Sequence, residues 1–252
     1  MAEDVADVGY GAQFEGWYDR LFPKDESAAD SAAQLAALHP DPDAGTCELG
    51  VGTGRIAVPV SRHVGKVTGV DSSPEMLAGL EADPDASLVV PVHADIREWV
   101  SDEQFGLVYV VCATLSMITS PEDQQKVLQR ASDMLTPGGL LVIETHNKPA
   151  VLALHEGRRR TSFFVPFPQP DTGLETHSTL LGDDLWHCSH IWYEDGRNRI
   201  GSELSRLTAP EEIDAYARRA GLVPEGRFSD WAGAEYSEQA PMVTVTCRKP
   251  EA

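Results

Sequence analysis

The sequence is poor in positive charge. Its 252 residues carry 20 lysine and arginine side chains against 40 aspartates and glutamates, which gives a formal net charge of −20. A surface this acidic repels the phosphate backbone of DNA or RNA, so we expect no nucleic-acid partner. The one basic run, Arg158-Arg159-Arg160, is interpreted as the solvated edge of a loop.

Long apolar runs and paired cysteines are also missing. The longest apolar run, from Phe105 to Ile118, is too short and too interrupted to span a bilayer, and the first residues lack the basic and apolar regions of a signal peptide. The four cysteines are widely spaced, and neither they nor the histidines and carboxylates show metal-ligand spacing. We therefore expect a cytoplasmic protein with buried, reduced thiols, no membrane partner and no metal.

The most informative segment that is present is a turn rich in glycine. Residues 44–49 are predicted to form a short strand that runs into Gly50, Gly52 and Gly54, and residues from 55 onward are predicted to start a helix. Glycines let the backbone pass close to a ligand, and the helix N-terminus behind them offers unpaired N–H groups. A nucleoside-type cofactor is therefore expected to lie across residues 50–54.

Strand-like and helix-like segments alternate from residue 44 to residue 145. Two helices open with serine, proline and acidic residues, at 72–75 and 120–123. The second is broken by Thr136-Pro137-Gly138-Gly139. Further strands are predicted at 66–70, 88–92, 105–112 and 140–143. Such alternation predicts a Rossmann-like, doubly wound α/β sheet.

The pattern changes after the fifth strand. Several β-like runs follow one another without a helix signal, at 162–165, 175–181, 185–193 and 200–207. A turn at Glu194-Asp195-Gly196 indicates a hairpin, so we predict an antiparallel β insertion. A last helix is predicted from Pro210 to Ala220 and a final strand at 242–248.

The chain is thus predicted to be one domain over residues 1–252. Its parts are an N-terminal helical lid or cap (1–43), a cofactor-binding core (44–148), the β insertion (150–208), and a last helix with C-terminal strands (209–252).

The spacing of the glycines and two aspartates bears on the kind of cofactor. A dinucleotide fingerprint reads G-x-G-x-x-G, whereas here the third glycine comes one residue early. Asp71 ends the second strand, where a carboxylate can accept the ribose hydroxyls of NAD or S-adenosylmethionine equally well. Asp95 ends the third strand and is suited to accept a hydrogen bond from an adenine amino group, with Ile96 packing on the ring. The alternative for Asp95 is a helix cap.

In their order and spacing these segments resemble the class I S-adenosylmethionine-dependent methyltransferases. The resembling motifs are Glu48-Leu49-Gly50-Val51-Gly52-Thr53-Gly54, Val70-Asp71-Ser72-Ser73-Pro74-Glu75-Met76-Leu77, Ala94-Asp95-Ile96 and Leu135-Thr136-Pro137-Gly138-Gly139. The resemblance implies a seven-stranded mixed sheet with helices on both faces, S-adenosylmethionine as methyl donor and S-adenosylhomocysteine as product.

The resemblance also implies roles for individual residues. Gly50, Gly52 and Gly54 would line the methionine and ribose part, and Asp71 would bind the ribose. Met76 would lie beside the adenine, Asp95 and Ile96 at its edge, and Cys112, within residues 111–114, beside the sulfonium.

Two further segments resemble small-molecule members of this superfamily. Residues 14–19 look like a Tyr-Asp segment that closes over the cofactor, with Tyr18 as a lid; the alternative is an amphipathic helix anchored by Trp17 and Tyr18. The β insertion resembles that of antibiotic-pathway and sugar-modifying methyltransferases, including amino-sugar N,N-dimethyltransferases. There it covers the acceptor or forms a dimer contact, which implies a small-molecule, natural-product acceptor and a homodimer through the insertion.

Methyl transfer from a sulfonium is an in-line displacement that depends on positioning, and a base is needed only if the acceptor must lose a proton. His146, leaving the fifth strand, is the first candidate for a catalytic residue, followed by His177, His187 and His190 of the insertion. On strand 185–193, His190 shares a face with Trp186 and Trp192, but which face points into the site stays open. A protein that binds the cofactor without transferring methyl, and a dehydrogenase, are the alternatives.

Overall fold

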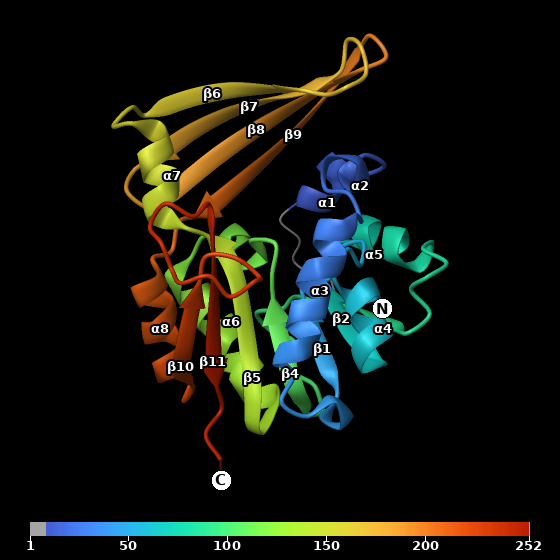
Figure 1. Cartoon of the computed structure of the whole chain (residues 1–252), viewed down its shortest axis with the longest axis vertical. Helices are drawn as coiled ribbons and strands as arrows, with labels where there is room; N and C mark the ends of the chain where they lie inside the picture. The colour runs from blue at the N-terminus through green and yellow to red at the C-terminus, as the bar shows by residue number, and fades with distance from the viewer. Residues whose placement is uncertain (1–8, 252) are drawn as a thin grey trace.

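A seven-stranded sheet forms the centre of the structure (Figure 1). In this computed structural model, which describes residues 9–251, the strand order is β3-β2-β1-β4-β5-β11-β10. The strands are β1 (Thr46–Leu49), β2 (Val67–Asp71), β3 (Val89–His93), β4 (Phe105–Val110), β5 (Leu135–His146), β10 (Val223–Phe228) and β11 (Met242–Arg248). The first five are parallel, and β11 pairs antiparallel with β5 and β10. The predicted mixed sheet is confirmed.

Helices cover both faces of this sheet. The helices are α1 (Tyr10–Phe14), α2 (Tyr18–Leu21), α3 (Glu26–Leu38), α4 (Ala57–Val64), α5 (Pro74–Glu81), α6 (Pro121–Met134), α7 (Lys148–His155) and α8 (Pro210–Arg219). Of these, α3, α4 and α5 cover one face of the sheet, and α6 and α8 cover the other. Two 3₁₀ turns span Pro42–Ala44 and Thr114–Met117.

The buried strand β4 shows how both faces are filled. Val108 and Val110 pack with α6 and α8, while Leu107 and Tyr109 pack with α3, α4 and α5. Alternate side chains of a strand point to opposite faces, so an almost uninterrupted apolar strand is what a doubly covered sheet requires.

The serine caps predicted for two helices are present. Ser73 Oγ accepts from the Met76 N–H ahead of α5, and Ser120 Oγ accepts from the Asp123 N–H ahead of α6. Such caps fix where each helix begins, close behind the carboxyl end of a strand.

A four-stranded antiparallel sheet lies across the carboxyl ends of the core strands (Figure 1). It consists of β6 (Arg160–Pro166), β7 (Gly173–Leu181), β8 (Leu185–Glu194) and β9 (Arg197–Arg206). Asp195 and Gly196, with φ of 52° and 68°, form the β8–β9 turn. The predicted insertion is confirmed, whereas α7, which connects it to β5, was not predicted.

Two predicted boundaries were wrong. Residues 136–139 do not separate α6 from the fifth strand: β5 begins at Leu135, and an irregularity in its pairing with β4 absorbs the extra residues around Gly138, whose φ is 76°. Strand β4 ends at Val110 because Cys112 and Ala113 turn the chain with φ of 54° and 61°.

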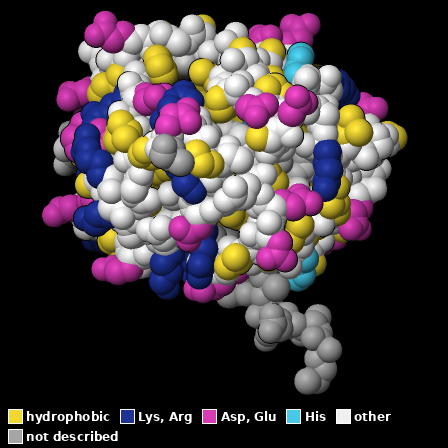
Figure 2. All heavy atoms as spheres, turned by 90° about the horizontal axis from the view of Figure 1, so that it is seen from below, with side chains coloured by type: hydrophobic (Ala, Val, Ile, Leu, Met, Phe, Trp, Pro, Cys, Tyr) yellow, Lys and Arg dark blue, Asp and Glu magenta, His cyan; other side chains and the backbone are white. Residues whose placement is uncertain are grey.

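Residues 1–8, which include the start of the predicted cap and the segment predicted not to be a signal peptide, lie outside the described residues. Within residues 9–251, none of the helices combines the length and apolar character needed to cross a bilayer. On the face seen in Figure 2, acidic, basic and apolar side chains are interspersed.

Candidate active site

A cavity of about 580 Å³ lies between the core, the insertion and the N-terminal helices. All residues predicted to bind the cofactor except Gly54 line it, and so does the first catalytic candidate, His146: Tyr18, Gly50, Gly52, Asp71, Met76, Asp95, Ile96, Cys112 and His146. Of the further catalytic candidates, His190 lines the cavity, whereas His177 and His187 do not. Residues far apart in the sequence meet here because the parallel strands all end at this edge of the sheet.

The glycine turn forms one wall of the cavity. Gly50, with φ of 86°, lies so close to Thr114 that a Cβ would come 2.3 Å from its Cγ2. Gly52 donates its N–H to Asp71 Oδ2 at 2.8 Å, and Asp71 Oδ1 accepts from the Ser73 N–H at 2.9 Å. These bonds hold the Asp71 carboxylate at the end of β2, against the turn.

Gly54 does not line the cavity, contrary to its predicted place beside the methionine part. A Cβ there would come 2.5 Å from Leu80 Cδ1, so this glycine allows the turn to pack on α5. The spacing of glycines in a sequence does not separate contact with a ligand from contact with a helix.

Cys112 and Glu144 lie side by side on the cavity wall. The Cys112 N–H donates to Glu144 Oε2 at 3.0 Å, and Trp231 Nε1 donates to Glu144 Oε1 at 2.7 Å. Burial raises the pKa of Glu144. The protein around the Cys112 sulfur keeps much of the water away from it although the residue opens to the cavity, and this desolvation, followed by the Glu144 charge, raises the pKa of Cys112 to about 12. The thiol is therefore protonated at neutral pH.

Cys112 also corrects an expectation about the thiols. Cys47, Cys188 and Cys247 are buried as predicted, but Cys112 is exposed. Its place at the end of the predicted strand 105–112 led to the prediction that it is buried, whereas the chain turns there and opens it to the cavity.

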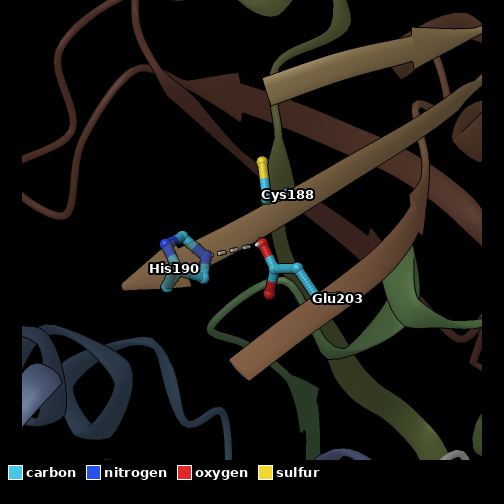
Figure 3. Close-up of side chains that lie close together, drawn as sticks. All are labelled: Cys188, His190 and Glu203. Atoms are coloured by element: carbon cyan, nitrogen blue, oxygen red, sulfur yellow. Dashed lines mark ion pairs between the residues drawn. The ribbon is translucent and has the colours of Figure 1, made fainter. Parts of the chain in front are cut away.

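The insertion supplies the far wall of the cavity. Trp186, Cys188 and His190 of β8 line it, which settles which face of this strand points inward. Thr176 Oγ1 lies 3.0 Å from His190 Nδ1, and Glu203 Oε1 lies 3.8 Å from His190 Nε2 (Figure 3). Glu203 stands beside this pair because it is directly opposite Cys188 in the β8–β9 register.

Three of these side chains are grouped in a way that could hold a metal ion. The ligand atoms of Cys188, His190 and Glu203 all lie within 4.8 Å of one another (Figure 3). Burial raises the pKa of Cys188 to about 12, so binding would have to displace the thiol proton. That the protein uses no metal stays a prediction from sequence.

His146, at the end of β5, lines the cavity and lies edge-on to Trp186, with ring centroids 4.8 Å apart. Burial lowers the pKa of His146, although the Glu203 charge opposes this effect. At neutral pH the imidazole is accordingly uncharged.

The N-terminal segment closes one side of the cavity. Tyr10 and Tyr18 line it, and Phe14 and Trp17 are buried beneath the insertion. The role of Tyr18 as a lid over the cofactor stays a prediction. Asp19 Oδ1 accepts from Thr53 Oγ1 at 2.6 Å, which ties α2 to the glycine turn.

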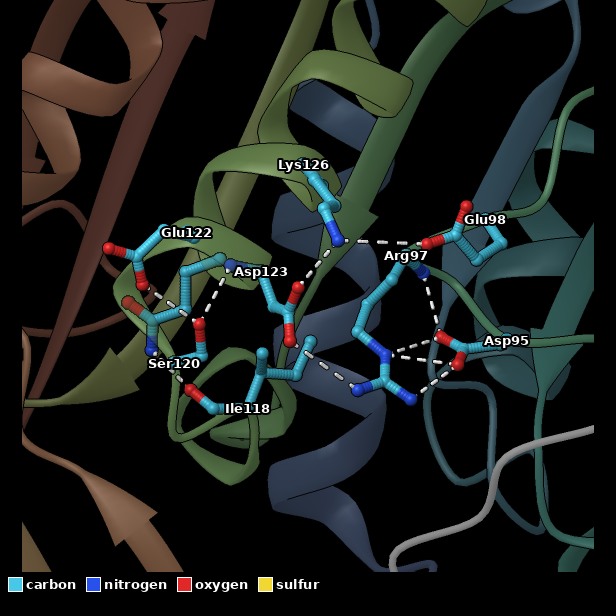
Figure 4. Close-up of polar contacts among 9 residues, drawn as sticks. Asp95, Arg97, Glu98, Ile118, Ser120, Glu122, Asp123 and Lys126 are labelled. Atoms are coloured by element: carbon cyan, nitrogen blue, oxygen red, sulfur yellow. Dashed lines mark hydrogen bonds and ion pairs between the residues drawn. The ribbon is translucent and has the colours of Figure 1, made fainter.

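The remaining end of the cavity is formed by Asp95 and Arg97 (Figure 4). Arg97 Nε lies 2.9 Å from both carboxylate oxygens of Asp95, and its Nη1 lies 3.6 Å from Asp123 Oδ2. Partial burial alone would raise the pKa of Asp95, but the hydrogen bonds from Arg97 hold it below its usual value. Asp95 therefore lines the site as an ion, and it caps no α-helix because only a turn follows it.

Sequence reasoning missed several residues of the cavity: Tyr10, Arg55, Glu144 and Glu203. Glu144 could have been found from its place at the end of a strand. Glu203 could not, because its position depends on the pairing register of two strands.

Comparison with known proteins gives consistent results. A methyltransferase-domain family matches residues 47–139. The CcbJ methyltransferase from Streptomyces caelestis is 28% identical with a TM-score of 0.85, over 96% of this chain and 98% of that one. The putative methyltransferase YqeM of Bacillus subtilis is 28% identical over 80% of this chain and 83% of its own length. The dTDP-3-amino-3,6-dideoxy-alpha-D-glucopyranose N,N-dimethyltransferase of Streptomyces fradiae is 27% identical over 57% of this chain and 59% of its own.

Proposed function

Since this chain is a class I S-adenosylmethionine-dependent methyltransferase that acts on a small molecule, we propose that the atom it methylates is an amine nitrogen. The observation that carries this proposal is the carboxylate of Glu203, which lines the cavity on the side of the β insertion. The acceptor is expected to bind on this side. Burial alone would raise the pKa of Glu203, but His190, whose Nε2 lies 3.8 Å from Oε1, and the neighbouring histidines hold it below its usual value. Glu203 thus carries a negative charge near neutral pH.

A fixed negative charge distinguishes between acceptor classes. Two unit charges about 4 Å apart interact by about 4 kcal/mol at the effective dielectric constant near a protein surface. The charge of Glu203 therefore favours an ammonium group and disfavours a carboxylate or phosphate at this place. The amino-sugar substrate named for the Streptomyces fradiae relative supports the same acceptor class.

The cofactor is expected to occupy the core side of the cavity. In this arrangement Asp71 accepts the ribose hydroxyls, Met76 lies beside the adenine, and Asp95 and Ile96 lie at its edge. Gly50, Gly52 and Cys112 line the methionine part, and Tyr18 closes over it. That all of these residues line one cavity supports the assignment.

His146 is proposed as a catalytic residue that contacts the acceptor. It lies on the cavity wall between the core and the insertion, so a group held there faces both the methyl donor and Glu203. An uncharged imidazole can orient the nucleophile by a hydrogen bond, and in-line displacement gains most from such positioning. A natural-product acceptor, a homodimer through the insertion, a cytoplasmic location and the absence of a nucleic-acid partner complete the proposal.

A panel of small molecules tests the proposal. Purified protein with S-adenosylmethionine should give N-methylated products from amino sugars and related amines, detected by mass spectrometry, and none from matched hydroxyl or carboxylate compounds. The Glu203→Gln variant should bind S-adenosylmethionine normally but raise the KM for amines at least about tenfold, a loss of about 1.4 kcal/mol. Methylation of oxygen or carbon only would contradict the acceptor class, and a methylated product of any kind would exclude a protein that merely binds the cofactor.

A further inference from the structure

An amine acceptor has to lose a proton before its nitrogen can attack the methyl group. An alkyl amine with a pKa like that of lysine carries a free lone pair in only about one molecule in 10³ at neutral pH. A methyltransferase that uses such an acceptor gains from a base close to the nitrogen. The inference below rests on the proposed function, since it concerns the same acceptor.

His190 occupies the position that such a base needs. It lies on β8 between Thr176 of β7, its direct cross-strand partner, and Glu203 of β9. The side chains of His190 and Glu203 are 13% and 15% exposed, and both line the cavity. Both ends of the imidazole therefore have polar neighbours, and Figure 3 shows the Glu203 carboxylate on the Nε2 side of the ring.

The two neighbours of His190 define what each ring nitrogen does. Nδ1 lies 3.0 Å from Oγ1 of Thr176, which is buried. When Nδ1–H donates to this hydroxyl, Nε2 carries a lone pair on the side of Glu203, 3.8 Å away. A proton taken up by Nε2 then lies next to a carboxylate, which stabilises the imidazolium.

We propose that His190 is the catalytic base that takes the proton of the acceptor ammonium, and that Thr176 is the residue that positions it. Nε2 accepts one proton from R–NH₃⁺ and leaves R–NH₂. The nitrogen lone pair then forms the N–C bond while the C–S electron pair passes to sulfur, which gives S-adenosylhomocysteine and R–NH₂⁺–CH₃. The imidazolium returns its proton to water once the products leave.

His146 is less suited to hold this proton. Its ring contacts the edge of Trp186, and burial lowers its pKa, whereas His190 lies between a hydroxyl and a carboxylate. The two histidines thus have separate tasks: His146 orients the acceptor as a neutral group, and His190 accepts the proton.

Other titratable groups also face Glu203 and His190. Tyr10 of α1 and Cys188 of β8 stay protonated near neutral pH, because burial raises the pKa of both. His146 of β5 and His187 of β8 both act on the charge of Glu203.

The test compares His190→Asn with His177→Asn, a control histidine on the neighbouring strand β7 whose side chain is 49% exposed and does not line the cavity. With an ordinary alkyl amine, His190→Asn should lower kcat/KM at neutral pH by at least about 100-fold. Its activity should recover as the pH approaches the pKa of the amine, or when the amine carries electron-withdrawing groups that lower its pKa. His177→Asn should keep the wild-type profile. Equal pH profiles and equal dependence on amine pKa in wild type and His190→Asn would overturn the proposal.

Thr176 is tested by a pair of variants. Thr176→Val should lower kcat about tenfold and shift the pH profile, with KM nearly unchanged, and Thr176→Ser should restore both. A loss of activity in Thr176→Val without any shift in the profile would contradict the positioning role.

Three further measurements complete the test, and the first distinguishes failure of this inference from failure of the proposed function. If wild-type protein methylates no amine, the proposed function fails; if it does and His190→Asn matches it, only the inference fails. Removal of activity by a chelator, with recovery on adding Zn²⁺, would overturn the inference in favour of a metal held by Cys188, His190 and Glu203. Calorimetric binding of S-adenosylmethionine by His190→Asn at the wild-type affinity shows that the variant is folded.

Discussion

At the scale of single residues, Asp71 has two roles, and the substitution Asp71→Ala removes both. Its carboxylate accepts the Gly52 N–H and is the proposed acceptor for the ribose hydroxyls. Asp71→Ala removes charge-assisted hydrogen bonds of about 1.5–3 kcal/mol each, so the affinity for S-adenosylmethionine should fall at least about tenfold. Isothermal titration calorimetry measures this.

A matched control for Asp71 is Asp85→Ala, which removes an exposed carboxylate paired with Arg62. Exposed ion pairs contribute little, so this variant should bind the cofactor like wild type. A dissociation constant that does not change in Asp71→Ala would mean that the ribose lies elsewhere.

At the scale of elements, the β insertion offers an unpaired edge. Within residues 9–251, strand β6 pairs only with β7, and its Phe163, Phe164 and Val165 are 43%, 55% and 45% exposed. Exposed apolar edge strands favour association with another chain. Phe164→Lys should therefore shift a homodimer toward monomer, as measured by sedimentation equilibrium, while Val223→Lys, at an exposed position of β10, should not. A wild-type protein that stays monomeric at all concentrations would contradict dimerisation through the insertion.

Elements are also the scale at which sequence predicts this fold well. The caps at Ser73 and Ser120 act over three residues, and the glycine turn is local too, so their consequences can be read directly from the chain. The strand ends that carry Asp71, Asp95 and His146 meet at one edge through a general property of parallel sheets.

The part of the site formed by the β insertion, where the acceptor is expected to bind, could not be predicted in the same way. Glu203 faces His190 only because β8 and β9 pair in one register, and a shift by one residue would turn it to the other face. The prediction that Cys112 is buried was wrong for a related reason. The strand ends two residues before it, and the turn that exposes its side chain contains no glycine or proline that would indicate a turn.

At the scale of the whole molecule, the net charge of −20 bears on the order in which ligands come and go. S-adenosylmethionine carries one net positive charge because of its sulfonium, and an ammonium acceptor carries another, whereas S-adenosylhomocysteine is neutral overall. A negative field raises the rate at which cations arrive and has little effect on a neutral product. The charge of the protein thus favours binding of both substrates over retention of the product.

Salt dependence distinguishes the effect of the protein's charge on its cationic substrates from its effect on the neutral product. Raising ionic strength from about 50 to about 300 mM shortens the screening length to below about 6 Å. The kcat/KM for S-adenosylmethionine and for a cationic amine should then fall by a factor of about two to ten. The inhibition constant of S-adenosylhomocysteine should change much less, and it serves as the internal control because it occupies the same site. If the neutral product showed the same salt dependence as the cationic donor, the effect would come from the stability of the protein, and the acidic surface would have no part in selecting the substrates.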